Sequence, residues 1–227
     1  MTVFSGRGVM VAQADSFPLV IAGPRMQRAR MGRLELLLWS GGLQNTAMPP
    51  AQLQQYVDGK LAVTGWSVHS PGEDHRAVMT QMRAAWPGSH VTGLNLNLEA
   101  GWFLEPGHPW DTDLPISHEH AALLAAVKDV FGADFPLAVT IIPAKVYPFS
   151  MWEGAIGDFF VELYDGSCVP LGNASDQYQM TLALTDAAAI ARSRVHPCVV
   201  HEQLPTYRTD AGALLFDSDR SPDESYV

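Results

Sequence analysis

The sequence predicts an α+β fold, with a mixed or mainly antiparallel sheet and two principal helices packed on one face. Apolar and polar residues alternate over 94–99, which is typical of a strand with one buried face. Segments 73–86 and 118–131 carry apolar residues at helical spacing. Alternation and short loops outnumber the regular strand–helix spacing of a doubly wound sheet. We expect one α+β domain over 1–205 and an acidic C-terminal tail over 206–227.

The first third of the chain consists mainly of short apolar runs. These predict strands at 7–14, 17–22, 34–39 and 61–68, and a short helix from Pro49 to about Val57. The run 34–39 ends at Ser40-Gly41-Gly42, which favours a buried strand, with a helix over 25–39 as the alternative.

Helix-start and helix-stop residues frame both principal helices. Ser70 and Glu73 fit a capping box before the first helix, and Ser117 is the expected cap of the second. Strand runs follow at 94–98 and 137–142. The two helix–strand units align at an offset of 45 residues. This alignment indicates either an internal duplication or, as we favour, the general similarity of two amphipathic units.

The last third predicts two further strands, at 158–164 and 178–184. A short alanine-rich helix is expected to begin at Asp186 and to reach about Arg194. Residues 198–203 predict a final strand.

Composition narrows the functional classes. The chain has 227 residues, of which 47% are hydrophobic, and this is enough for a sizeable core. The net charge of −10 argues against a nucleic-acid partner, because phosphate contacts require a basic surface. No run approaches the ~20 apolar residues that span a bilayer, so we expect a cytoplasmic protein with no membrane partner. Abundant arginine and alanine indicate a bacterial or phage genome.

The two cysteines give no strong motif. Cys168 and Cys198 are far apart in the sequence and form no Cys-x-x-Cys pair, which leaves both a disulfide and two free thiols open. No cofactor is expected.

The stretch 107–120 holds the densest polar chemistry. It supplies His108, Asp111, Asp113 and His120 as candidate catalytic residues, because these are side chains of acid/base and metal sites. On a helix, His118 and His120 point about 200° apart, so only one of them can join the loop residues. Whether the stretch binds metal stays open, since turn and cap hydrogen bonds explain the same residues.

Three polar residues share one face of the strand at 94–98. Asn95, Asn97 and Glu99 can line a cleft in which Glu99 is a general base, or they can form an ordinary solvent face. The segment 65–69 is not a Gly-x-Ser-x-Gly nucleophile motif, because His69 stands where the last glycine belongs.

Aromatic residues cluster in two loops. One loop carries Trp102, Phe103 and Trp110, and the other carries Tyr147, Phe149 and Trp152. Such clusters form the hot spots of protein interfaces, or they cover a hydrophobic core.

These observations favour a non-enzymatic protein-binding or assembly role, as an acidic inhibitor, an immunity-type protein or a structural subunit. The partner would be another protein or a second copy of the chain, bound through the aromatic loops and the acidic surface. One alternative is a metal-dependent or general acid/base enzyme, hydrolase-like, that uses the stretch 108–120. Another is a small-molecule binding domain with a cleft over Asn95, Asn97 and Glu99.

Overall fold

A seven-stranded parallel sheet is the centre of the computed structural model. The structure describes residues 3–4, 7–11, 31–44, 62–86, 91–99, 101–162, 174–198, 207–208 and 214–215. The strands are β1 (Arg7–Val11), β2 (Met31–Ser40), β3 (Ala62–Val68), β4 (Leu94–Leu98), β5 (Leu137–Ile141), β6 (Asp158–Glu162) and β7 (Val195–Cys198). They lie in chain order, and every neighbouring pair is parallel. Two short strands, β8 (Tyr207–Arg208) and β9 (Leu214–Leu215), pair antiparallel.

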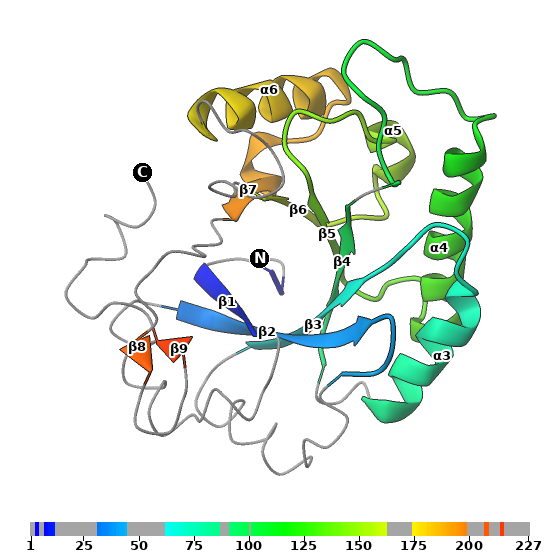
Figure 1. Ribbon diagram of the computed structural model, residues 1–227, viewed down its shortest axis with the longest axis vertical. Helices are drawn as coiled ribbons and strands as arrows, with labels where there is room; N and C mark the ends of the chain where they lie inside the picture. Colours follow the sequence, from blue (N-terminus) through cyan, green and yellow to red (C-terminus); the bar gives the residue numbers. More distant parts are fainter. Residues whose placement is uncertain are drawn as a thin grey trace.

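The sheet curls around its own inner face (Figure 1). The Arg33 guanidinium carbon of β2 lies 4.9 Å from the centre of the Phe160 ring of β6. In a flat sheet, strands four places apart would be separated by roughly 19 Å. Side chains from distant strands can meet only because the sheet forms a barrel-like wall.

The helices cover the outside of this wall. Helices α3 (His75–Ala85) and α4 (Pro115–Phe131) lie side by side against it, whereas α6 (Ala174–Ala187) lies near β6 and β7 (Figure 1). The short helix α5 (Phe149–Trp152) follows β5, and a 3₁₀ turn at Arg192–Arg194 precedes β7. Among the described helices, none combines the length and the apolar character needed to span a bilayer.

The outer face of the sheet forms the main hydrophobic core. Leu94, Leu96 and Leu98 of β4 pack there with residues of α3 and α4, among them Met82 and Leu123. Leucines of the two neighbouring strands pack over Gly65 of β3. A Cβ at this position would lie 2.3 Å from the Leu38 side chain of β2 and 3.3 Å from that of Leu94 in β4, so a larger residue would displace them.

The expected mixed or mainly antiparallel α+β fold is therefore wrong, because the described sheet is all-parallel and the fold is α/β. The alternating pattern of β4 caused the error. All five residues of β4 are buried, with its leucines under the helices and its asparagines inside the barrel. A polar barrel interior gives the same alternation as a solvent-exposed sheet face.

The N-terminal end of the barrel is filled by aromatic and charged side chains. Phe4 packs against Phe160 and Ala138, and a Cβ on Gly93 would lie 2.9 Å from the Phe4 ring. The Arg33 guanidinium stacks on both rings and donates to the Phe4 carbonyl. These contacts close this end of the barrel.

Several predicted elements are present with shifted ends. The expected strand at 178–184 is wrong, because this segment lies within α6. Helix α3 is capped by Asp74, whose Oδ1 accepts from the Ala77 N–H, and α4 begins at Pro115. The run 17–22, the helix at 49–57 and Cys168 lie outside the described residues. The domain boundary at 205 stays a prediction, because only 207–208 and 214–215 are described beyond it.

Candidate active site

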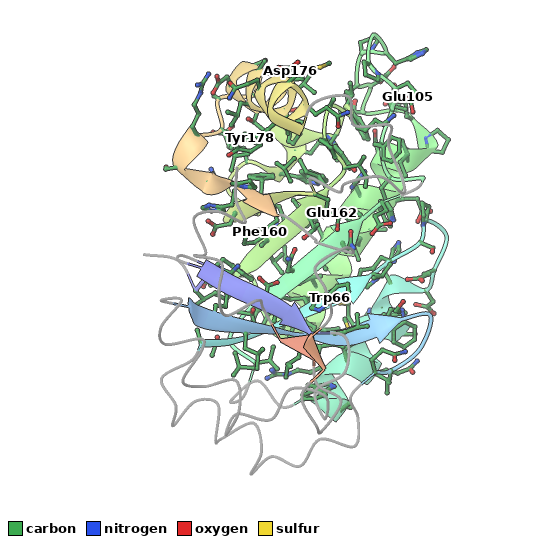
Figure 2. All side chains as sticks on the ribbon, turned by 60° about the vertical axis from the view of Figure 1, so that its left-hand side comes forward. Trp66, Glu105, Phe160, Glu162, Asp176 and Tyr178 are labelled. Carbon is green, nitrogen blue, oxygen red and sulfur yellow. The ribbon has the colours of Figure 1, made fainter. Side chains whose placement is uncertain are left out.

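Two carboxylates lie at the C-terminal ends of β4 and β6. Glu99 directly follows the last residue of β4, and Glu162 is the last residue of β6. Phe160 and Glu162 lie one after the other along β6 (Figure 2). In a parallel barrel, all strands end at one rim, and catalytic residues gather there in characterised enzymes.

The amide of Asn97 connects these two carboxylates. Its Nδ2 donates to Glu99 Oε1 at 2.7 Å and lies 3.4 Å from Glu162 Oε1. The two carboxylate oxygens are therefore within about 6 Å of each other, which is the scale of the paired carboxylates of glycoside hydrolases, roughly 5 to 9.5 Å. Asn97 thus holds an acidic pair at the rim.

Burial differs within this group of three residues. Asn97 and Glu162 are 4% and 2% exposed, whereas Glu99 is half-buried and reaches solvent. Asn97 Oδ1 is buried and has no hydrogen-bond partner among the described residues. A buried acceptor without a partner costs about 1–3 kcal/mol, so a ligand that donates a hydrogen bond here would be favoured.

Tyr147 fixes the backbone beside Glu99. Its hydroxyl donates to the Leu98 carbonyl at 2.8 Å and accepts from the Ile142 N–H at 3.1 Å, which joins the ends of β4 and β5. Burial raises the pKa of Tyr147, and the negative charges of Glu162 and Glu99 raise it further. The hydroxyl therefore stays protonated and holds the turn that carries Glu99.

A second polar network fills the barrel below the acidic pair. Thr140 Oγ1 donates to Asn95 Oδ1 at 2.9 Å, and Asn95 Nδ2 donates to Glu35 Oε2 at 2.9 Å. Arg33 Nε donates to Glu35 Oε1 at 2.8 Å. Burial raises the pKa of Glu35, while Arg33 and Asn95 oppose this effect. Because both Glu35 oxygens are bonded and the group is buried, it supports the barrel and is not open to substrate.

A histidine-containing cluster lies where β3 meets α3. His69, Glu73 and His75 each offer a ligand atom, and these atoms all lie within 4.8 Å of one another, close enough to hold a metal ion. Burial lowers the pKa of His69, and Glu73 opposes this effect. His69 is therefore held in the neutral form that binds metal ions.

The structure does not bring together the four residues predicted in the stretch 108–120. His108, Asp111 and Asp113 are exposed, and the Asp113 N–H donates to Asp111 Oδ1 within the loop. His120 is 1% exposed. Asp111 and Asp113 thus make a turn hydrogen bond within the loop, as the alternative to a metal site predicts.

His120 lies among three tryptophan rings, with ring centres 4.8 Å from Trp102, 5.4 Å from Trp110 and 5.2 Å from Trp152. Its Nε2 donates to the Trp102 carbonyl at 2.9 Å. Burial lowers the pKa of His120 to about 4, so the ring is neutral near pH 7.

The predicted aromatic residues lie mainly in the core. Trp102, Tyr147, Phe149 and Trp152 are buried, and Phe103 and Trp110 are half-buried. Tyr147, Phe149 and Trp152 contact one another, and Phe149 and Trp152 reach Phe159 of β6. These residues therefore pack between the rim and the helices. This agrees with the alternative interpretation, in which the aromatic loops cover a hydrophobic core.

The sequence offers Glu99 as a candidate general base but does not single out Glu162. Glu162 closes the apolar run 159–161, and an acid at the end of a buried strand was the available signal. The position of Glu162 pairs it with Glu99 only when β4 and β6 are known to be parallel, because parallel strands end at the same rim.

Two known structures with a similar fold are a chitinase and a glucosidase. No protein-family model and no curated protein matches the sequence. A chitinase from Rhizomucor miehei superposes with a TM-score of 0.52 at 15% identity, over 84% of this chain and 67% of that chain. A glucosidase from Croceicoccus marinus gives 0.51 at 12% identity, over 92% of this chain but only 54% of the glucosidase.

These likenesses correct the functional expectation. The fold resembles that of TIM-barrel-like glycosidases, and on this finding the expected non-enzymatic protein-binding or assembly role is corrected. Neither the interaction role nor a phage origin gains support from them. At these identities the likeness shows the fold alone, so the chemistry must be argued from the rim residues.

Proposed function

We propose that the chain is a glycoside hydrolase that uses Glu99 as general acid and Glu162 as the second carboxylate. The observation that carries the proposal is the Asn97 amide, which holds both carboxylates at the rim of a parallel barrel. Two carboxylates at this separation are the usual machinery of glycoside hydrolysis. The chitinase and the glucosidase of the same fold support glycosides as the substrate class.

Exposure assigns the roles of the two acids. Glu99 is half-buried, so it can reach the leaving-group oxygen of a substrate at the rim. Asn97 binds Glu99 Oε1 and leaves Oε2 to face the leaving group. Glu162 is buried beside Asn97, where its charge can stabilise the positive charge that develops on the sugar ring.

The separation favours one stereochemical course. The shared amide limits the distance between the two Oε1 atoms to about 6 Å at most, which is shorter than the ~6.5–9.5 Å between the carboxyl groups of inverting enzymes. Glu162 is 2% exposed, so this course requires substrate binding to open the rim beside it. Glu162 then bonds to the anomeric carbon as Glu99 protonates the departing oxygen, and Glu99 takes a proton from the water that breaks this bond in the second step. Retention of the anomeric configuration is the expected outcome.

The test is hydrolysis by purified protein of chitin oligosaccharides and of α- and β-linked aryl glucosides. Glu99→Gln and Glu162→Gln should each lower the rate on the preferred substrate by about 10²–10⁴-fold. The matched control is Glu153→Gln, since Glu153 is an exposed glutamate after α5. Activity that survives both rim substitutions would contradict the proposal.

A further inference from the structure

The cluster at the start of α3 has the donor set of a transition-metal site. His69 directly follows β3, Glu73 lies in the next turn, and His75 is the first residue of α3. Two imidazoles and one carboxylate, with the fourth position open, are the ligands of one class of zinc site. We infer that His69, Glu73 and His75 bind a zinc-class divalent metal ion through one nitrogen of each histidine and a Glu73 oxygen.

The distances fit a tetrahedral ion. Metal–ligand bonds of ~2.0–2.2 Å place neighbouring ligand atoms about 3.3 Å apart. His69 Nδ1 and Glu73 Oε2 are already 3.3 Å apart, and all three ligand atoms lie within 4.8 Å. The remaining gap between ligand atoms is at most about 1.5 Å, which small side-chain rotations can close.

One nitrogen in the cluster is buried without a partner. His75 is 5% exposed, and its Nδ1 has no hydrogen-bond partner among the residues that the structure describes. An unsatisfied buried nitrogen is costly in the folded protein. A metal ion gives this nitrogen a partner.

The other nitrogen of each histidine is bonded to oxygen. His69 Nε2 lies 2.8 Å from Ser67 Oγ, and His75 Nε2 lies 3.1 Å from Glu119 Oε2. Glu119 also accepts from the Gly72 N–H at 2.8 Å, which ties α4 to the loop that carries the ligands. Metal-binding histidines have outer partners of this kind, which fix the orientation of the ring.

The same contacts resemble a Ser–His–carboxylate triad, but burial excludes that reaction. Ser67 is 0% exposed on the outer face of β3, so no substrate reaches its hydroxyl. Glu73 is different, because its side chain is 21% exposed. Solvent and an ion can therefore enter the cluster beside Glu73.

A bound ion would stiffen the turn that carries Glu99. The His69 carbonyl accepts from Trp102 Nε1 at 2.8 Å, and the Trp102 N–H donates to the Glu99 carbonyl at 3.1 Å. The metal site thus touches the rim through the Trp102 indole and the backbone groups on either side of it. Its existence does not depend on glycoside hydrolysis.

Calorimetric titration of chelator-treated full-length protein with Zn²⁺ tests the site. We expect one ion per chain, a melting temperature that rises with Zn²⁺, and no comparable effect of Mg²⁺, which prefers oxygen ligands. Glu73→Gln should weaken Zn²⁺ binding by more than about tenfold, and Glu119→Gln by about 10–100-fold. Glu153→Gln is the matched control and should bind like the wild type.

Circular dichroism is used to establish that each variant is folded before its Zn²⁺ affinity is measured. A third variant, His75→Gln, should also lose Zn²⁺ affinity. If it fails to fold, Glu73→Gln still tests the site, because Glu73 is partly exposed and its substitution should leave the fold intact. Co²⁺ in place of Zn²⁺ should give a visible spectrum without a thiolate charge-transfer band. No saturable Zn²⁺ binding, unchanged affinity in Glu73→Gln, or a thiolate band would overturn the inference.

Discussion

The two ends of the barrel are built in opposite ways. At the N-terminal end, Phe4, Arg33 and Phe160 fill the space, and the Arg33–Glu35 pair is bonded and buried. At the C-terminal rim, Glu99 reaches solvent, and the buried Asn97 Oδ1 has no partner within the described part of the chain. At one end the charged pair is bonded internally, and at the other the Asn97 amide oxygen is left available to a ligand.

The difference between the two ends indicates that one contributes to folding stability and the other to the reaction. In parallel barrels the N-terminal end contributes to stability and the C-terminal end carries the reaction. Substitutions at the rim should therefore change activity with little change in the free energy of unfolding. Substitutions at the filled end should do the reverse.

The largest expected effect is at the rim. Glu99→Gln should lower the hydrolytic rate by about 10²–10⁴-fold, because the amide cannot donate a proton to the leaving group. The substituted side chain can still accept from Asn97 Nδ2, so the free energy of unfolding should change by no more than about 0.5 kcal/mol. Urea denaturation and steady-state rates measure the two quantities. A large loss of stability would make Glu99 a structural residue.

The second effect is at the filled end. Arg33→Met should cost about 3–5 kcal/mol of folding free energy, because Glu35 would keep a buried charge without its ion pair. The double variant Arg33→Met/Glu35→Leu should recover much of this loss, since an apolar pair replaces a buried ion pair at little cost. Urea denaturation measures both variants. If the single and double variants had the same free energy of unfolding, the Arg33–Glu35 pair would not account for the stability of the filled end.

The third effect concerns His120, on the helix side of the sheet. Burial lowers its folded-state pKa from 6.5 to about 4, so between these values the unfolded chain binds a proton that the folded protein does not. Stability should therefore fall as the pH drops from 6.5 toward 4, by about 3 kcal/mol for this group. His120→Gln should flatten the curve of unfolding free energy against pH. Parallel curves for variant and wild type would refute this assignment.

The smallest effect is at the start of α3. Asp74→Ala removes the Oδ1 acceptor of the Ala77 N–H and should cost about 1 kcal/mol of folding free energy. Catalytic rate should not change, because Asp74 is outside the rim. Thermal unfolding measures the loss, with Glu153→Gln as a neutral control. A cost as large as that of Arg33→Met would contradict the role as a simple cap.

Local patterns predicted many of the elements but not their arrangement. The segments of α3, β4, α4 and β5 were all found from helical spacing or apolar runs. Their 45-residue repeat was attributed to general similarity, yet these segments are successive helix–strand units of one parallel sheet. Periodicity identifies each element, but the direction in which strands pair depends on contacts between distant residues.

The candidate site was predicted only in part, for the same reason. Glu99 and Asn97 share a strand, so alternation placed them on one face. Glu162 is 63 positions beyond Glu99 in the sequence, and only the curled sheet brings it to Asn97. The stretch 107–120 has the densest polar composition, although Asp111 and Asp113 bond to each other within the loop and His120 is buried among aromatic rings.

The most direct test of the acid–carboxylate pair is the dependence of the Glu99→Gln defect on the leaving group. Two aryl glycosides of the preferred sugar are compared: one releases 2,4-dinitrophenolate, which needs no proton, and the other releases a phenol of high pKa. If Glu99 is the general acid, the defect in kcat/KM, which reports the step that releases the leaving group, should be at least about tenfold smaller on the dinitrophenyl glycoside. An equal defect on both substrates would show that Glu99 donates no proton and would contradict the proposed reaction.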